Sequence, residues 1–189
     1  MLTDKEILET MGMVSSQHLD VRCITMGISL FDCISEDAER TATKVYDKIT
    51  TYAKDLVSVG DKIATMYGVP VVNKRVSVTP ISLVGAASGG YLPIALAMDR
   101  AAAETGIDFI GGYTALVQKG ATAKENAFLE TIPEALASTK KVCSSVNVAS
   151  SRAGINMDAV RKMGEIVKKA AYLTRTEHSP TAAHRSSCF

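Results

Sequence analysis

Neither sign of charge is in excess in this chain: lysine and arginine number 21, aspartate and glutamate 20, and the formal net charge is +1. Proteins that bind nucleic acid or a membrane surface through their overall field carry a clear excess of positive charge. We therefore expect no nucleic-acid partner and no membrane partner. Any ligand has to be recognised locally, by particular side chains.

Cysteines and long apolar runs are also scarce. The four cysteines are too far apart for the close pairs of a zinc site and too few for a small secreted disulfide scaffold. They are Cys23, Cys33, Cys143 and Cys188. Residues 1–9 carry acids where a secretory signal needs basic and then apolar residues, and no apolar stretch reaches the roughly 18 residues of a membrane span. These absences predict reduced thiols and a cytoplasmic location.

The common cofactor-binding motifs are missing as well. His18, His178 and His184 show no metal-ligand spacing, and the chain has no phosphate-binding Walker loop. The glycines between residues 85 and 90 do not form a dinucleotide fingerprint. We expect no metal site and neither a common NTPase nor a Rossmann dehydrogenase, and the sequence leaves any other cofactor unidentified.

What the chain does contain is a regular change of hydrophobic period. Apolar residues alternate with period two in four segments, which predicts strands at 21–30, 71–79, 108–117 and 142–149. Steps of three and four predict helices between them, at 3–17, 35–67, 92–104, 123–131, 133–138 and from about 156. Strands that alternate with helices favour parallel pairing, so the predicted fold class is α/β.

Single residues place the helix ends and the domain limits. Ser58 and Gly60 mark the expected kink in segment 35–67, which is one long helix or two, and Gly68 with Pro70 ends it. Pro133 suits the first position of a short helix. Residues 177–189 have no apolar period, so we expect one domain over 1–176, incomplete by itself, and a disordered tail.

The second face of the predicted strands is small or polar, as at Thr25, Arg75, Ser77 and Cys143. Beneath another helical layer such groups would be buried without partners, at about 1–3 kcal/mol each. A barrel lumen or an open cleft avoids this cost and predicts a ligand site. Simple solvation, or hydrogen bonds to further chain, explains the same pattern equally well.

The candidate ligand-binding residues come from these faces and from the turn after the third strand. They are Thr25, Asn73, Arg75, Ser77, Gly111, Gly112, Gln118, Lys119, Cys143, Ser145 and Asn147. The guanidinium group of Arg75 suits a carboxylate or phosphate of a small molecule, unless it pairs with an internal acid. Gln118 and Lys119 follow the third strand, where α/β proteins place functional loops, although a solvated turn is the simpler interpretation.

Two further candidates allow more than one interpretation. The paired glycines at 111 and 112 weaken a strand, and indicate a bulge or the close approach of a ligand or of backbone. Cys143 has the chemistry of a nucleophile or radical carrier, but no histidine lies near it in the sequence. A quiet, half-buried strand cysteine is the favoured interpretation.

Four blocks of sequence resemble, in order, segments of the uncharacterised UPF0210 family, also called DUF711. The blocks are DVRCITMGISLFDCI, VPVVNKRVSVTPISLVGAA, GIDFIGGYTALVQKG and KVCSSVNVASSRAGINMDAV, and the resemblance runs from about residue 5 to about residue 174. It implies the ten-stranded α/β barrel of pyruvate formate-lyase and anaerobic ribonucleotide reductase. The glycyl loop and cysteine hairpin of those radical enzymes have no matching residue here, and a shared fold does not establish a shared function.

Family members are more than twice as long, so the resemblance implies that this chain is the front part, or a fragment, of a larger protein. The expected function is a small-anion-binding enzyme or metabolite binder that uses the polar barrel lumen. The alternatives are a non-catalytic regulatory or structural protein, or a truncated fragment without function. Because four strands of a barrel leave an unpaired edge, we also expect homo-oligomers or association through that edge.

Overall fold

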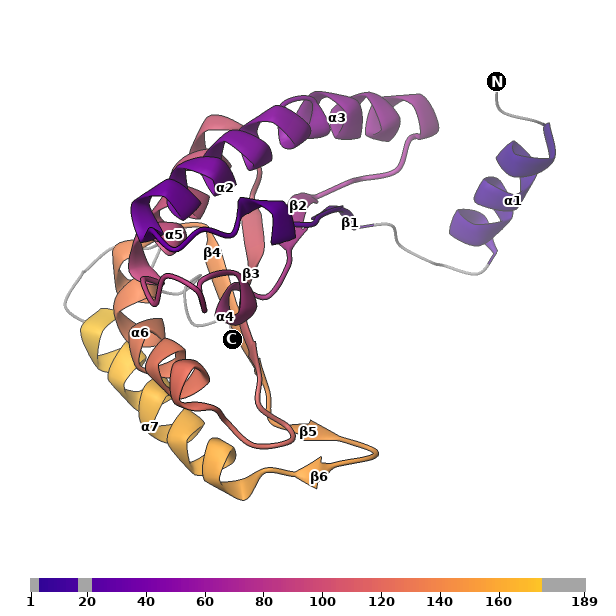
Figure 1. The fold of residues 1–189 in the computed structure, drawn as a ribbon. Helices are drawn as coiled ribbons and strands as arrows, with labels where there is room; N and C mark the ends of the chain where they lie inside the picture. Colours follow the sequence, from indigo (N-terminus) through magenta and orange to yellow (C-terminus); the bar gives the residue numbers. More distant parts are fainter. Residues whose placement is uncertain (1–3, 17–21, 175–189) are drawn as a thin grey trace.

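The computed structural model describes residues 4–16 and 22–174 of the chain. It is an α/β structure, as expected, with helices between successive strands of its main sheet (Figure 1). The helices are α1 (Asp4–Ser15), α2 (Ala38–Ala53), α3 (Leu56–Tyr67), α4 (Ile81–Val84), α5 (Leu92–Glu104), α6 (Ala123–Ser138) and α7 (Met157–Thr174), with a 3₁₀ turn at η1 (Phe31–Cys33). The strands are β1 (Cys23–Ile28), β2 (Asn73–Val78), β3 (Phe109–Leu116), β4 (Val142–Asn147), β5 (Ala149–Ser150) and β6 (Gly154–Ile155).

The main sheet contains four parallel strands that lie in sequence order, β1-β2-β3-β4. The chain passes from each of these strands to the next through helices. Figure 1 shows α2, α3, α5 and α6 along one side of the sheet. This arrangement confirms the prediction of parallel strands between helices. No helix within residues 4–16 and 22–174 is both long and apolar enough to cross a membrane.

The hydrophobic core lies between the sheet and these helices. Most strand residues that point toward the helices are almost fully buried, as are many of the helix residues that meet them. Among the largest are Ile110 and Tyr113 from β3, Ile49 from α2, Met98 from α5, and Phe128, Leu129 and Ile132 from α6. Burying one such side chain stabilises the fold by about 1.5–3 kcal/mol. Ser144, a polar exception on this face of β4, donates a hydrogen bond to the Tyr113 carbonyl at 2.8 Å.

The helical segment 35–67 consists of two helices, but the break is not at Ser58 and Gly60. It lies at Lys54 and Asp55, between α2 and α3. Gly60 is instead buried inside α3, where an added Cβ would lie 3.2 Å from the Cγ atom of Lys74. The glycine therefore makes room for the Lys74 stem, whose Nζ atom pairs with Asp61 at 2.7 Å.

The two helices expected on either side of Pro133 are one helix, α6, with the proline in its interior. Proline removes one backbone hydrogen bond and normally ends or kinks a helix. Here Leu129 and Ile132 before the proline, and Leu136 after it, are all buried in the same core. Tertiary packing therefore compensates for the local preference. The first turn has the capping box formed by Thr122 and Glu125.

Gly112 forms a bulge in β3, which confirms one of the two interpretations of the paired glycines. The register with β4 shifts between Gly111 and Tyr113, and Gly112 has a φ of 123°. An added Cβ would lie 2.4 Å from Cγ2 and 2.7 Å from the carbonyl oxygen of Val78. Only glycine fits here, because neighbouring backbone comes so close.

The fourth strand is shorter than expected and is followed by a hairpin that the periodicity does not predict. β4 ends at Asn147, and β5 then pairs with β6 in antiparallel orientation. Asn156 follows the hairpin and caps α7, since its Oδ1 atom accepts a hydrogen bond from the Ala159 amide at 3.2 Å. The hairpin thus projects beyond the end of β4, near the start of α7 (Figure 1).

Candidate functional site

The face of the sheet that the helices leave uncovered carries most of the candidate residues. Paired residues of parallel strands point to the same side, so the register arranges them in rows. The rows are Cys23 and Asn73; Thr25, Arg75 and Phe109; Gly27, Ser77, Gly111 and Cys143; Thr114 and Ser145; Leu116 and Asn147. We call this surface the open face. Thr25, Arg75, Ser77, Ser145 and Asn147 are exposed on it, whereas Asn73, Gly111 and Cys143 are half-buried.

Arg75 is the central cation of the open face. Its guanidinium carbon lies 5.6 Å from the centre of the Phe109 ring, in the next strand of the same row. A ring at this distance attracts the cation and restricts its orientation. Within residues 4–16 and 22–174, the Arg75 side chain makes no hydrogen bond or ion pair, so its five N–H donors remain available.

The hydroxyl groups nearest to Arg75 are those of Thr25 and Ser77. Thr25 is directly opposite Arg75 on β1, and Ser77 is two residues further along β2 on the same side. The Thr25 hydroxyl also contacts the Cys23 thiol at 3.4 Å. A small anion on Arg75 can therefore accept hydrogen bonds from the guanidinium and from either hydroxyl, without help from more distant strands.

Cys143, Ser145 and Asn147 share the open face but are further from Arg75. They belong to β4, two strands away, which is about 10 Å at the usual strand spacing of about 4.8 Å. The Ser145 hydroxyl hydrogen-bonds that of Thr114 at 2.9 Å. One small anion cannot span this distance, so Arg75 and the β4 residues contact a common ligand only if it is extended.

The two glycines of β3 have different surroundings. Gly111 lies in the Ser77 row of the open face, and an added Cβ there would meet no atom within 4 Å. Gly112 lies against Val78, as described above, and that contact explains why this position requires a glycine. The open face therefore has exposed backbone without a side chain at Gly111. Gly27 lies in the same row, and Ser77 is between the two glycines.

Gln118 and Lys119 lie beyond the end of β3, in the turn that leads to α6. They line a separate cavity of about 640 Å³ with residues of the β5–β6 hairpin. Arg152, at the tip of that hairpin, is a cavity residue that sequence reasoning missed. Its only local signal is a turn-like stretch of serine, alanine and glycine at 149–154.

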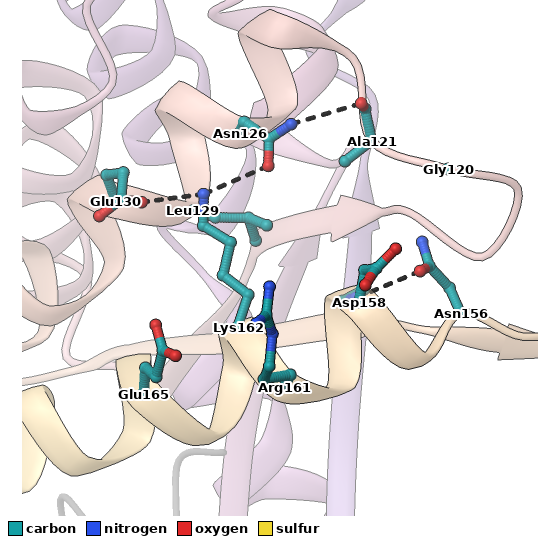
Figure 2. A pocket seen from close by; sticks show the side chains of 11 residues that line it. Gly120, Ala121, Asn126, Leu129, Glu130, Asn156, Asp158, Arg161, Lys162 and Glu165 are labelled. Carbon is teal, nitrogen blue, oxygen red and sulfur yellow. Dashed lines mark hydrogen bonds and ion pairs between the residues drawn. The ribbon is translucent and has the colours of Figure 1, made fainter.

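A second cavity, of about 490 Å³, lies between α6 and α7 and contains none of the predicted site residues (Figure 2). Lys162 projects into it from α7, with its Nζ atom 2.8 Å from a Glu130 carboxylate oxygen and 3.2 Å from Asn126 Oδ1. The hydrogen bond from Lys162 lowers the pKa of Glu130. Asp158, Arg161 and Glu165 supply further charges of both signs, so this cavity is largely compensated.

Metal-binding side chains do not gather in the part of the chain that the structure describes: residues 4–16 and 22–174 contain no group of three or more His, Cys, Asp or Glu able to hold an ion. His18, His178, His184 and Cys188 lie outside these ranges, and so does the predicted tail. Cys33 is buried beneath α2, and burial raises the pKa of its thiol. It faces neither the open face nor a cavity described above.

Comparison with known proteins agrees with the resemblance seen in the four sequence blocks. The family model described as "Uncharacterised ACR (DUF711)" matches residues 12–188. The chain belongs to this family. A "UPF0210 protein" of Ligilactobacillus salivarius is 59% identical over 170 residues, which are 89% of this chain. Another from Streptococcus sanguinis is 57% identical over 172 residues, which are 90% of this chain.

These DUF711 relatives are much longer than this chain. The matched residues make up 38% of the Ligilactobacillus protein and 39% of the Streptococcus sanguinis protein. The names of the relatives state no activity, substrate or partner. What the whole protein does is therefore to be argued from the site.

Proposed function

We propose that this chain supplies the first four strands of a longer α/β barrel, and that the open face lines a lumen that binds a small anionic metabolite. The barrel is of the pyruvate formate-lyase type that the family resemblance implies. In this proposal Arg75 holds a carboxylate or phosphate of the ligand. The observation that carries the proposal is the open face itself, with one unpaired guanidinium among small hydroxyl, thiol and glycine positions.

The contrast with the core supports a ligand rather than a missing helical layer. Large apolar side chains fill the side of the sheet that faces the helices. The open face instead presents Thr25, Ser77 and Ser145, too small and polar to pack against a further apolar helix. Hydroxyl groups buried in that way would cost about 1–3 kcal/mol each unless they were paired. A water-filled or ligand-filled lumen avoids this cost.

The proposed site binds and orients an anion, and no group on it is assigned a chemical step. Arg75 offers two parallel N–H donors to a carboxylate or phosphate, and Phe109 limits the orientations of the guanidinium. Thr25 and Ser77 supply the nearest hydroxyl donors. Cys143 and Ser145 become contacts of the same ligand if it extends about 10 Å across the sheet.

The proposal is tested by titrating the 189-residue chain with acetate and with inorganic phosphate while amide signals are followed by NMR. We expect saturable shifts at Thr25, Arg75 and Ser77. Arg75→Gln should weaken this binding at least about tenfold, because a charge-assisted hydrogen bond contributes about 1.5–3 kcal/mol. The matched control is Arg40→Gln, since Arg40 is exposed on α2. It should bind as the parent chain does.

Several outcomes would decide against the proposal. Shifts that are absent, or that are the same in Arg75→Gln and the parent chain, would remove the anion site and favour the regulatory, structural or fragment alternatives. Cys143→Ser should keep the parent affinity for both anions, because Cys143 is two strands from Arg75. If an activity is found for the complete family protein, we expect the equivalent serine variant to retain most of it. Loss of that activity with an intact fold would assign the thiol a chemical role.

A further inference from the structure

The cavity beyond the carboxyl end of β3 is a second candidate site, remote from Arg75. Two loops form it: the turn between β3 and α6, and the β5–β6 hairpin after β4. Its lining residues are Gln118, Lys119, Gly120, Arg152, Ala153, Ile155 and Asn156, and its volume is about 640 Å³. Arg75 pairs with Phe109, the first residue of β3, whereas this cavity begins at Gln118, beyond the last, roughly 25–30 Å away at about 3.3 Å per residue.

The charge of this cavity is positive and uncompensated. Lys119 and Arg152 are both exposed, and neither side chain makes a hydrogen bond or an ion pair with any residue in 4–16 or 22–174. None of the lining residues is acidic. The neighbouring cavity between α6 and α7 differs, because Lys162 is paired there with Glu130 and two more acids are present (Figure 2). Two unpaired cations that converge on one cavity favour a doubly charged anion.

The Gln118 side chain supplies no charge to this cavity. Its Oε1 atom is buried and has no hydrogen-bond partner in the described part of the chain. A ligand group the size of water does not reach a buried atom, so Lys119 and Arg152 are the charged side chains of the cavity available to a ligand.

The walls of the cavity are held in place by hydrogen bonds within the protein. Asn156 uses both ends of its amide: Nδ2 donates to the Val117 carbonyl at 2.8 Å, and Oδ1 accepts from the Ala159 amide at 3.2 Å. The Ser150 hydroxyl accepts from the Ala153 amide at 3.0 Å and closes the turn that carries Arg152. The carboxyl ends of parallel strands are also where open α/β sheets bind ligands.

We propose that this cavity binds a phosphate group, carried by a phosphate monoester or by inorganic phosphate. Lys119 and Arg152 hold the phosphate. The site does not require the proposed lumen. Its residues have amide signals of their own, so its failure and the failure of the Arg75 site are observed separately.

The test titrates the 189-residue chain with glycerol 3-phosphate and follows the amides of residues 118–120 and 150–154 by NMR. We expect saturable binding that Lys119→Gln and Arg152→Gln each weaken about tenfold or more, because each removes a charged partner of the phosphate. Lys140→Gln is the matched control, since Lys140 is exposed just before β4 at the other end of the sheet. It should bind glycerol 3-phosphate like the parent chain.

The source of the phosphate is tested by titrating inorganic phosphate in the same way as glycerol 3-phosphate. Lys119→Gln should weaken every probe that binds, because the phosphate is the group that Lys119 contacts. The proposal is overturned if neither probe binds at these residues. It is also overturned if Lys140→Gln weakens binding as much as Lys119→Gln.

Discussion

The two faces of the parallel sheet are made of alternate residues of the same four strands, and most of one face is apolar whereas most of the other is small or polar. On β2, Val76 and Val78 are buried against the helices, whereas Arg75 and Ser77 between them are exposed. On β3, Ile110 and Tyr113 are fully buried, and Thr114 next to them hydrogen-bonds Ser145 on the open face. Alternation, shifted by one residue at the Gly112 bulge, thus separates the residues that hold the fold from those that face away from the helices.

This difference implies that substitutions on the covered face should change stability, whereas those on the open face should leave stability intact and change binding. The covered face tolerates a polar residue only with a partner, as at Ser144, which donates to the Tyr113 carbonyl. On the open face Arg75 has the Phe109 ring beside it, but no hydrogen bond or ion pair with any residue in the described ranges. Three pairs of measurements can break or sharpen this comparison.

The largest contrast is expected between Ile110→Ala and Ser77→Ala. Ile110 is fully buried beside Val76 and Val142. Its truncation should lower the free energy of unfolding by about 2–5 kcal/mol, from lost burial and the cavity left behind. Ser77 is exposed on the open face, so Ser77→Ala should change the free energy of unfolding by less than about 0.5 kcal/mol. Urea denaturation of both variants measures the two free energies of unfolding. Equal losses of stability would mean that the open face is packed against other groups in solution.

A smaller contrast is expected between the adjacent glycines. Gly112→Ala places a methyl group against the Val78 carbonyl at a φ that L residues rarely adopt, and should cost about 1–3 kcal/mol. Gly111→Ala places one on the open face, with no atom within 4 Å, and should change stability by less than about 0.5 kcal/mol. Thermal and urea unfolding compare the two. A neutral Gly112→Ala would contradict the bulge.

The smallest effect is expected from Tyr113→Phe. The Tyr113 hydroxyl hydrogen-bonds Thr131 Oγ1 at 2.7 Å inside the core, and its loss should cost about 1 kcal/mol near neutral pH. Burial raises the pKa of Tyr113 above its ordinary value of about 10. The folded state therefore holds this proton more tightly than the unfolded state, and the resulting stability is present below about pH 10 and lost as the pH rises further.

This pH dependence is checked by measuring the free energy of unfolding of both proteins between about pH 8 and about pH 11, a range that brackets ordinary tyrosine ionisation. The parent chain should lose stability more steeply than Tyr113→Phe above about pH 10. Every residue other than Tyr113 is the same in the two proteins, so the difference between their stability curves reports the effect of Tyr113. Parallel curves would show that Tyr113 is not buried in solution.

Much of the local structure follows from the sequence. Residues 92–104 were predicted as a helix and form α5 within the same bounds. Gly68 was predicted to end the preceding helix and does so in the left-handed conformation, with a φ of 65°. These features were predictable because helical periodicity and C-terminal glycine caps depend on residues close together in the chain.

The failures arise where distant residues decide the outcome. Gly60 was expected to kink a helix, but its size is required by the stem of Lys74, from another element. Pro133 was expected to begin a helix, but the core on both sides of it keeps α6 continuous. Arg152 gave no signal as a site residue, because only the β5–β6 hairpin brings it to the cavity that Lys119 also lines.

For the open face, the division between sequence and tertiary structure is clear. That Arg75 and Ser77 point away from Val76 and Val78 follows from the strand repeat of two residues, which is a property of the backbone. That Thr25 and Phe109 flank Arg75 follows only from the strand order and the register. These are set by packing of the covered face against the helices, because a slip of one residue would turn every buried side chain toward solvent.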